Sequence, residues 1–71
     1  MSAKLSTPNQ ILKTALQKEI QARDFYAELA RQTSVDFVKE LLERLQNEES
    51  KHVRMIRTML ARLESGKSIV P

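Results

Sequence analysis

Residues 38–63 read VKELLERLQNEESKHVRMIRTMLARL, and the spacing of their apolar side chains predicts one long amphipathic helix. Residues separated alternately by three and four positions line one face of a helix. The members of this stripe are Val38, Leu42, Leu45, Glu49, His52, Ile56, Met59 and Leu63. Glu49 and His52 interrupt its centre, where packed helices normally carry apolar side chains. A carboxylate in such a seam loses hydration, so it requires a counter-charge or a bound metal ion.

A matching stripe in the first half of the chain carries one interruption of its own. Its members are Leu12, Ala15, Glu19, Ala22, Tyr26 and Leu29. The preceding residues Thr7, Pro8 and Gln10 form a helix start. Threonine can cap the helix, proline suits its first position and glutamine completes a capping box. We therefore predict a first helix over about residues 8–32.

Small and polar residues mark the boundaries of the second helix. The break lies at residues 32–34, with Thr33 or Ser34 as the N-cap. Gly66 suits a left-handed C-cap at the other end. The sequence therefore predicts an all-α fold in one small domain over residues 1–71, with a second helix over about 34–64 and a flexible tail over 66–71.

The short connection makes the two helices antiparallel neighbours. Glu19 lies about 14 residues before a turn at Thr33, and Glu49 lies about 16 residues after it. At a rise of about 1.5 Å per residue, both carboxylates reach a similar height along the hairpin. His52 lies one turn beyond Glu49 on the same helix face. We predict that these three side chains converge on one metal site.

Ordinary helix interactions give the same residues a metal-free interpretation. Glu19 can pair with Arg23 four residues later, and His52 can bond to a backbone carbonyl or to Glu48. The chain would then be a helical module that dimerises through its seam. This alternative predicts that Glu19→Leu or His52→Leu raises stability without changing any activity.

Two further kinds of side chain lie close to the proposed ligands. Tyr26 lies two turns beyond Glu19 and is either a core tyrosine or a hydroxyl that orients a metal ligand or supplies an electron. Met55 and Met59 flank the turn that holds His52, and we interpret them as core filler rather than ligands.

Both the apolar surface and the number of ligands predict a dimer. Apolar side chains of the second helix extend from Phe37 and Met55 round to Val53, which is more than one neighbouring helix can cover. Di-iron carboxylate bundles use a Glu from each of two helices and Glu-x-x-His from each of the other two. Two copies of this chain about a two-fold axis supply that set. Carboxylates with imidazole suit iron or manganese, and zinc would also bind.

Composition excludes several other classes of protein. The chain has no cysteine, which excludes disulfides, zinc–thiolate sites and iron–sulfur clusters. A net charge of +3 without a recognition motif predicts no nucleic-acid partner. Residues 1–7 lack the apolar core of a secretory signal, and no apolar run is long enough to span a membrane. We therefore expect a cytoplasmic protein.

These motifs together resemble the ferritin-like superfamily and, within it, the rubrerythrin-like group. The residues that carry the resemblance are Leu12, Lys13, Ala15, Leu16, Glu19, Ala22, Asp24, Phe25, Tyr26, Leu41, Leu42 and Glu48 to His52. The two-helix encapsulated ferritins are the most similar, because they place one Glu about thirty residues before a Glu-x-x-His. The similarity covers roughly residues 8–64.

The resemblance implies that two hairpins dimerise into a ferritin-like four-helix bundle with an interfacial di-iron ferroxidase centre. Carried over by motif, the ligands would be Glu19, Glu49 and His52, with Tyr26 nearby. Fe(II) and O2 or H2O2 would be the substrates, for iron storage or detoxification. The resemblance also implies a ring such as a decamer, often inside an encapsulin shell. The alternative is a rubrerythrin-like peroxide scavenger, whose usual cysteine-bound iron site this chain cannot form.

Overall fold

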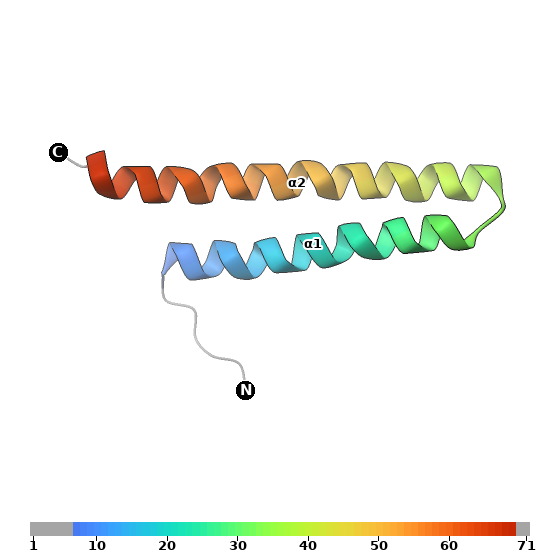
Figure 1. Cartoon of the computed structure of the whole chain (residues 1–71), viewed down its shortest axis with the longest axis horizontal. Coiled ribbons are helices and arrows are strands. Elements are labelled where there is room, and N and C mark those ends of the chain that lie inside the picture. The colour runs from blue at the N-terminus through green and yellow to red at the C-terminus, as the bar shows by residue number, and fades with distance from the viewer. Residues whose placement is uncertain (1–6, 70–71) are drawn as a thin grey trace, which may run out of the picture.

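The chain folds into two antiparallel helices that lie side by side along most of their length (Figure 1). The computed structural model describes the backbone of residues 7–69 and the side chains of residues 7–66. Helix α1 spans Pro8–Gln32, and helix α2 spans Asp36–Ile69. Residues 33–35 connect them, and no strand occurs in the described part of the chain. The predicted all-α hairpin is therefore confirmed.

The start of α1 follows the predicted capping chemistry. The Gln10 backbone N–H donates to Thr7 Oγ1 over 3.1 Å, and the Thr7 N–H donates to Gln10 Oε1 over 3.3 Å. This reciprocal pair is a capping box, with Pro8 at the first helical position. Two backbone donors that the helix cannot satisfy internally thereby gain partners.

The start of α2 lies slightly later than residue 34. Thr33 Oγ1 accepts a hydrogen bond from the Val35 N–H over 3.1 Å, so this side chain orders the connection rather than the first turn of α2. The Lys39 N–H donates to the Val35 carbonyl over 2.9 Å, which opens the helical bonding pattern at Val35. Asp36 then places a negative charge in the first turn, where the helix dipole favours it.

The prediction for the end of α2 was wrong, because the helix continues through Gly66 to Ile69. No glycine among residues 7–69 has a positive φ, so Gly66 is not a left-handed C-cap. A left-handed cap is usually accompanied by an apolar residue after the glycine that packs on the last turn. Lys67 and Ser68 are polar and favour no such contact. The predicted tail is thus helical over 66–69, and residues 70–71 lie outside the described part.

The single chain has little interior. Among the described residues only Ala30 and Val53 are buried apolar side chains, one from each helix. Seven large apolar side chains remain exposed: Ile11, Phe25, Val35, Phe37, Leu41, Met55 and Met59. Neither described helix combines the length and apolar character needed to cross a membrane. The apolar surface therefore lies on a hairpin whose two helices cannot cover it alone.

Candidate metal centre

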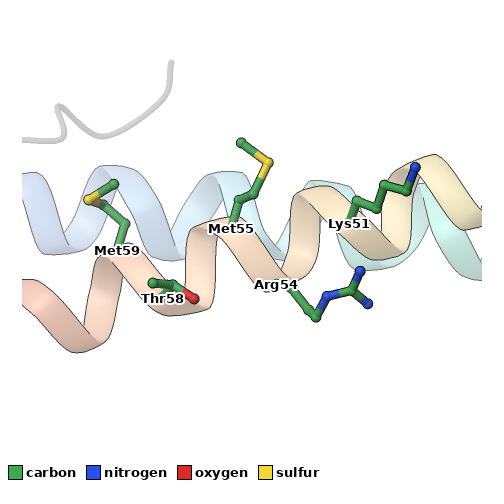
Figure 2. A pocket seen from close by; sticks show the side chains of 5 residues that line it. All are labelled: Lys51, Arg54, Met55, Thr58 and Met59. Atoms are coloured by element: carbon green, nitrogen blue, oxygen red, sulfur yellow. The ribbon is translucent and has the colours of Figure 1, made fainter.

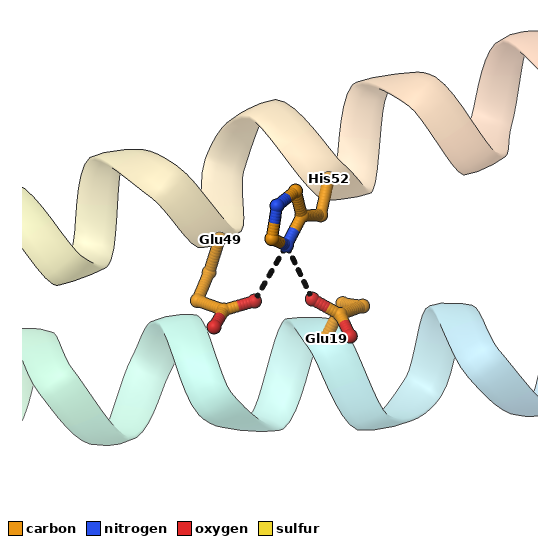
Figure 3. Close-up of side chains that lie close together, drawn as sticks. All are labelled: Glu19, Glu49 and His52. Carbon is orange, nitrogen blue, oxygen red and sulfur yellow. Dashed lines mark hydrogen bonds and ion pairs between the residues drawn. The ribbon is translucent and has the colours of Figure 1, made fainter.

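Three acidic and imidazole side chains meet between the middles of the two helices. Glu19 extends from α1, while Glu49 and His52 extend from successive turns of α2 (Figure 3). The i, i+3 spacing puts Glu49 and His52 on one face, and the short connection brings Glu19 to the same height. The structure therefore brings together all three residues that the sequence predicts as ligands.

The His52 ring directs one nitrogen at both carboxylates. Nδ1 lies 3.1 Å from Glu19 Oε1 and 3.3 Å from Glu49 Oε1 (Figure 3). One ligand atom from each residue can be chosen so that all three lie within 4.8 Å of one another. The three side chains thus form a compact cluster, which we call the triad.

The triad fits a divalent transition-metal ion. Imidazole nitrogen and carboxylate oxygen bind such ions at about 2.0–2.2 Å, and two ligands at right angles then lie about 3 Å apart. The separations around His52 Nδ1 match that value. Carboxylate and imidazole together suit iron, manganese or zinc. Three protein ligands leave further coordination positions for substrate or for ligands from another chain.

The three groups shift one another's pKa values. A hydrogen bond with Glu19 is the main cause that raises the pKa of Glu49, and the same bond is the main cause that lowers the pKa of Glu19. Hydrogen bonds to Glu19 and then to Glu49 raise the pKa of His52. The triad therefore holds protons more firmly than isolated Glu49 and His52 would. A metal ion must displace those protons in order to bind.

The neighbouring charges do not compensate the triad. Arg23 Nε lies 3.2 Å from Asp24 Oδ1, so Arg23 forms its ion pair with Asp24 and not with Glu19. Lys51 Nζ lies 3.6 Å from Glu48 Oε2, which places Glu48 in a surface pair instead of a bond to His52. The metal-free pairings of Glu19 with Arg23 and of His52 with Glu48 are thus not the ones the structure forms. Without a metal ion, protonated His52, whose pKa both carboxylates raise, would offset one of the two negative charges, whereas a divalent ion would offset both.

The triad is open on one side of the single chain. Glu49 and Glu19 side chains are 20% and 31% exposed, whereas His52 is 48% exposed. The predicted seam position is correct, but one hairpin does not enclose it. Within the single chain the triad is therefore accessible to solvent on the side of His52.

Tyr26 and the methionines are not members of the triad. Tyr26 is partly buried and packs its ring 6.0 Å from that of Phe25. No hydrogen bond joins its hydroxyl to a described ligand, so its proposed role in orienting the site stays a prediction. Met55 and Met59 are 65% and 43% exposed, so within one chain they do not fill a core as predicted.

Comparison with known proteins identifies one family. The family model described as rubrerythrin matches residues 10–71, a range that includes the whole triad. No curated protein and no solved structure matches the chain.

Proposed function

The chain belongs to the rubrerythrin family, and we propose that it is a ferroxidase whose di-iron centre forms between two copies. Rubrerythrin-like domains usually bind two iron ions, which agrees with the ligand chemistry of the triad. The observation that carries the proposal is the convergence of Glu19, Glu49 and His52 at one height of the hairpin. We assign the oxidation of iron to these three residues.

A second copy is needed to complete the ligand set. One chain offers two carboxylates and one imidazole, whereas a di-iron carboxylate bundle uses four carboxylates and two imidazoles. Two chains about a two-fold axis supply that number without further residues. The exposure of His52 and of the apolar side chains around it supports the same arrangement, because association would bury both.

Each ligand has a distinct task at the centre. Glu19 and Glu49 bring negative charge that favours the ferric over the ferrous ion, and His52 fixes the geometry through Nδ1. His52 must bind as the neutral ring, so its remaining proton lies on Nε2, which points away from the carboxylates (Figure 3). Bound iron would supply the one-electron chemistry of the centre.

Ferrous ion is the substrate of the proposed reaction. Two ferrous ions each lose one electron and become ferric. One O2 accepts the two electrons with two protons to give H2O2, or one H2O2 accepts them to give two waters. The ferric product then leaves, because two helices side by side cannot enclose a mineral. Storage would take place in a separate compartment, for which an encapsulin shell and a ring of dimers are the arrangement that the family resemblance favours.

The family match favours peroxide scavenging as the second candidate at the same centre. The two functions differ in oxidant and in turnover. A scavenger is reduced again after each peroxide and needs an external electron donor, since the chain has no cysteine to hold a second iron site. A ferroxidase consumes fresh ferrous ion and releases ferric ion at every cycle.

Iron oxidation by ligand variants tests the proposal. Glu49→Ala and His52→Ala should each abolish oxidation of added ferrous ion, followed as ferric absorbance under O2 and under H2O2. Glu48→Ala is the matched control, because Glu48 precedes Glu49 but pairs with Lys51 at the surface. Wild-type rates in both ligand variants would reject the assignment, and oxidation by peroxide with a recycled donor would favour the scavenger.

A further inference from the structure

One side of α2 carries an imidazole and two thioethers on neighbouring turns. His52, Met55 and Met59 follow one another at spacings of three and four residues, so at about 100° per residue they lie within about 60° around the helix. The His52 side chain is 48% exposed, and Met55 and Met59 are 65% and 43% exposed. Met55 and Met59 extend to the same side of α2 (Figure 2). Three side chains with metal-binding atoms are therefore open to solvent in one row.

The direction of helical side chains brings these atoms toward one another. Long side chains in a helix lean toward its N-terminus, so Met55 extends over the turn that holds His52, and Met59 extends over the turn that holds Met55. Residues three or four positions apart have Cβ atoms about 5–6 Å apart. Methionine has three rotatable bonds, so each sulfur can move toward a shared ion without a change in the backbone. A cation above this row can thus gain three ligands from α2 alone.

The hydrogen bonds of His52 leave its outer nitrogen free for such an ion. Nδ1 lies 3.1 Å from Glu19 Oε1 and 3.3 Å from Glu49 Oε1, and an ionised carboxylate can only accept hydrogen bonds. The ring therefore donates from Nδ1, and its neutral form keeps a lone pair on Nε2, which points away from the carboxylates (Figure 3). A histidine that donates its other N–H to a carboxylate is the usual form of a metal ligand.

The ligand atoms favour a soft monovalent ion. Thioether sulfur binds soft ions such as Cu(I), whereas hard divalent ions prefer oxygen ligands. The nearby cations act in the same direction, because Lys51 and Arg54 border the methionines in a shallow groove and repel a divalent ion more strongly than a monovalent one. Arg54 points away from the methionines, and Lys51 Nζ lies 3.6 Å from Glu48 Oε2 (Figure 2). A single positive charge is therefore tolerated at this row.

We propose that His52 Nε2 and the sulfurs of Met55 and Met59 form a second metal site, which binds Cu(I) or Ag(I). This site uses the outer nitrogen of His52, whereas the triad uses the inner one. Iron at Nδ1 leaves the ring proton on Nε2, and a soft ion at Nε2 leaves it on Nδ1. A neutral His52 ring therefore serves one ion at a time, so a soft ion displaces iron from the triad. Only this competition rests on the proposed function.

Silver titrations test the second site, because Ag(I) shares the ligand preferences of Cu(I) and keeps its oxidation state in air. The iron-free chain is titrated with silver nitrate in chloride-free buffer and followed by calorimetry. The wild type should bind one equivalent. Met55→Leu should weaken binding by about 10–100-fold or more, because loss of a group that only orients a metal ligand already costs that much. Leucine is similar in volume and Met55 is exposed, so the fold is preserved.

A relocated methionine is the matched control. The double variant Leu41→Met, Met55→Leu keeps the number of thioethers, but it moves one to a position that is 52% exposed and about 16 Å from His52 along the helix. This variant should bind silver no better than Met55→Leu does. Glu49→Gln is the second control: it weakens the triad but leaves Nε2 and both sulfurs in place, so it should retain silver binding.

Magnetic resonance identifies the ligand atoms directly. In a chain labelled with ¹³C-methyl methionine and ¹⁵N histidine, silver should shift the methyl signals of Met55 and Met59 and the Nε2 signal of His52. The Nδ1 signal should keep the character of a protonated nitrogen, because its hydrogen bonds to the carboxylates remain.

Four results would overturn the second site. These are equal silver affinity of the wild type and Met55→Leu, recovered affinity in the double variant, loss of silver binding in Glu49→Gln, and a silver shift at Nδ1 instead of Nε2. Silver should also inhibit iron oxidation by the wild type, and inhibition without displacement of iron, or no inhibition, would reject the competition.

Iron oxidation without added silver separates the second site from the proposed function. Met55→Leu should oxidise ferrous ion at the wild-type rate, because Met55 is not a member of the triad. Silver binding by a chain that does not oxidise iron rejects the ferroxidase and leaves the second site. Iron oxidation by a chain whose silver affinity does not depend on Met55 rejects the second site and leaves the ferroxidase.

Discussion

The Glu49→Gln variant should lose metal stabilisation without losing stability in the absence of metal. Glutamine keeps the size of the side chain but removes one of two adjacent carboxyls. The proximity of Glu19 raises the pKa of Glu49, so a neutral amide at this position is tolerated as well as the protonated acid. The metal-free variant should therefore melt at or slightly above the wild-type temperature. A residue needed only for packing would behave in the opposite way.

The size of the metal effect follows from one triad per chain. Metal at 100 times its dissociation constant stabilises the folded state by about 2.7 kcal/mol. For a domain of this size, each 1 kcal/mol shifts the melting temperature by about 4–8 °C, so the wild type should gain about 11–22 °C. If the variant binds 100-fold more weakly, the same metal concentration contributes only about 0.4 kcal/mol, or about 2–3 °C.

Thermal melts followed by circular dichroism measure both quantities. Wild type, Glu49→Gln and the control Glu48→Gln are compared with and without Mn(II), which avoids redox chemistry in air. Protein concentration is held constant because association makes the melting temperature depend on it. An unchanged wild-type melt at saturating metal, or an equal shift in Glu49→Gln, would refute the reasoning.

Three smaller perturbations test other parts of the structure. Metal affinity should fall as the pH drops, because the pKa of His52 is raised above 6.5 and the proton competes with the metal; titration calorimetry at two pH values measures this. Without metal the sign reverses: the raised pKa gives His52 a stabilising contribution that is complete below about pH 6.5 and is lost as the pH rises through the folded-state pKa, as melts across that range would show. Thr7→Ala removes the capping oxygen and should cost about 1 kcal/mol in a denaturant titration, whereas the exposed helix-interior change Thr14→Ala should not destabilise. Gly66→Ala should stabilise by up to about 1 kcal/mol, because Gly66 is helical and nothing lies within 4 Å of an added Cβ; destabilisation would instead indicate a left-handed cap.

The convergence of the triad could be predicted from the sequence because helical periodicity is the dominant constraint on this chain. A repeat of 3.6 residues puts Glu49 and His52 on one face, and a connection of three residues leaves little freedom in the relative height of Glu19. The start of α1 could be predicted equally well, because a capping box depends only on residues that are close together in the sequence.

Other features depend on contacts that the helical periodicity of the sequence does not determine. The direction of His52 Nδ1 toward both carboxylates is a choice of rotamer, which only the assembled helices determine. Gly66 is compatible with both helical and left-handed backbone, so its type alone could not locate the end of α2. For Met55 and Met59, the apolar pattern identifies an apolar face of α2 but does not tell that this face is exposed in the single hairpin.

Association with a second copy would change two features of the single chain. Among the described residues the hairpin buries only two apolar side chains and leaves Phe37, Leu41, Met55 and Met59 exposed, so it is poorly stabilised by its own core. The triad is also partly open to solvent, with 48% of the His52 side chain exposed. Pairing two hairpins would bury these apolar side chains and would at the same time place a second triad beside the first. Metal binding and association are then linked: an ion held by both copies stabilises the dimer, and a dimer already formed presents a ready site. Association would in this way let a chain of this length enclose a metal centre that its own core is too small to cover.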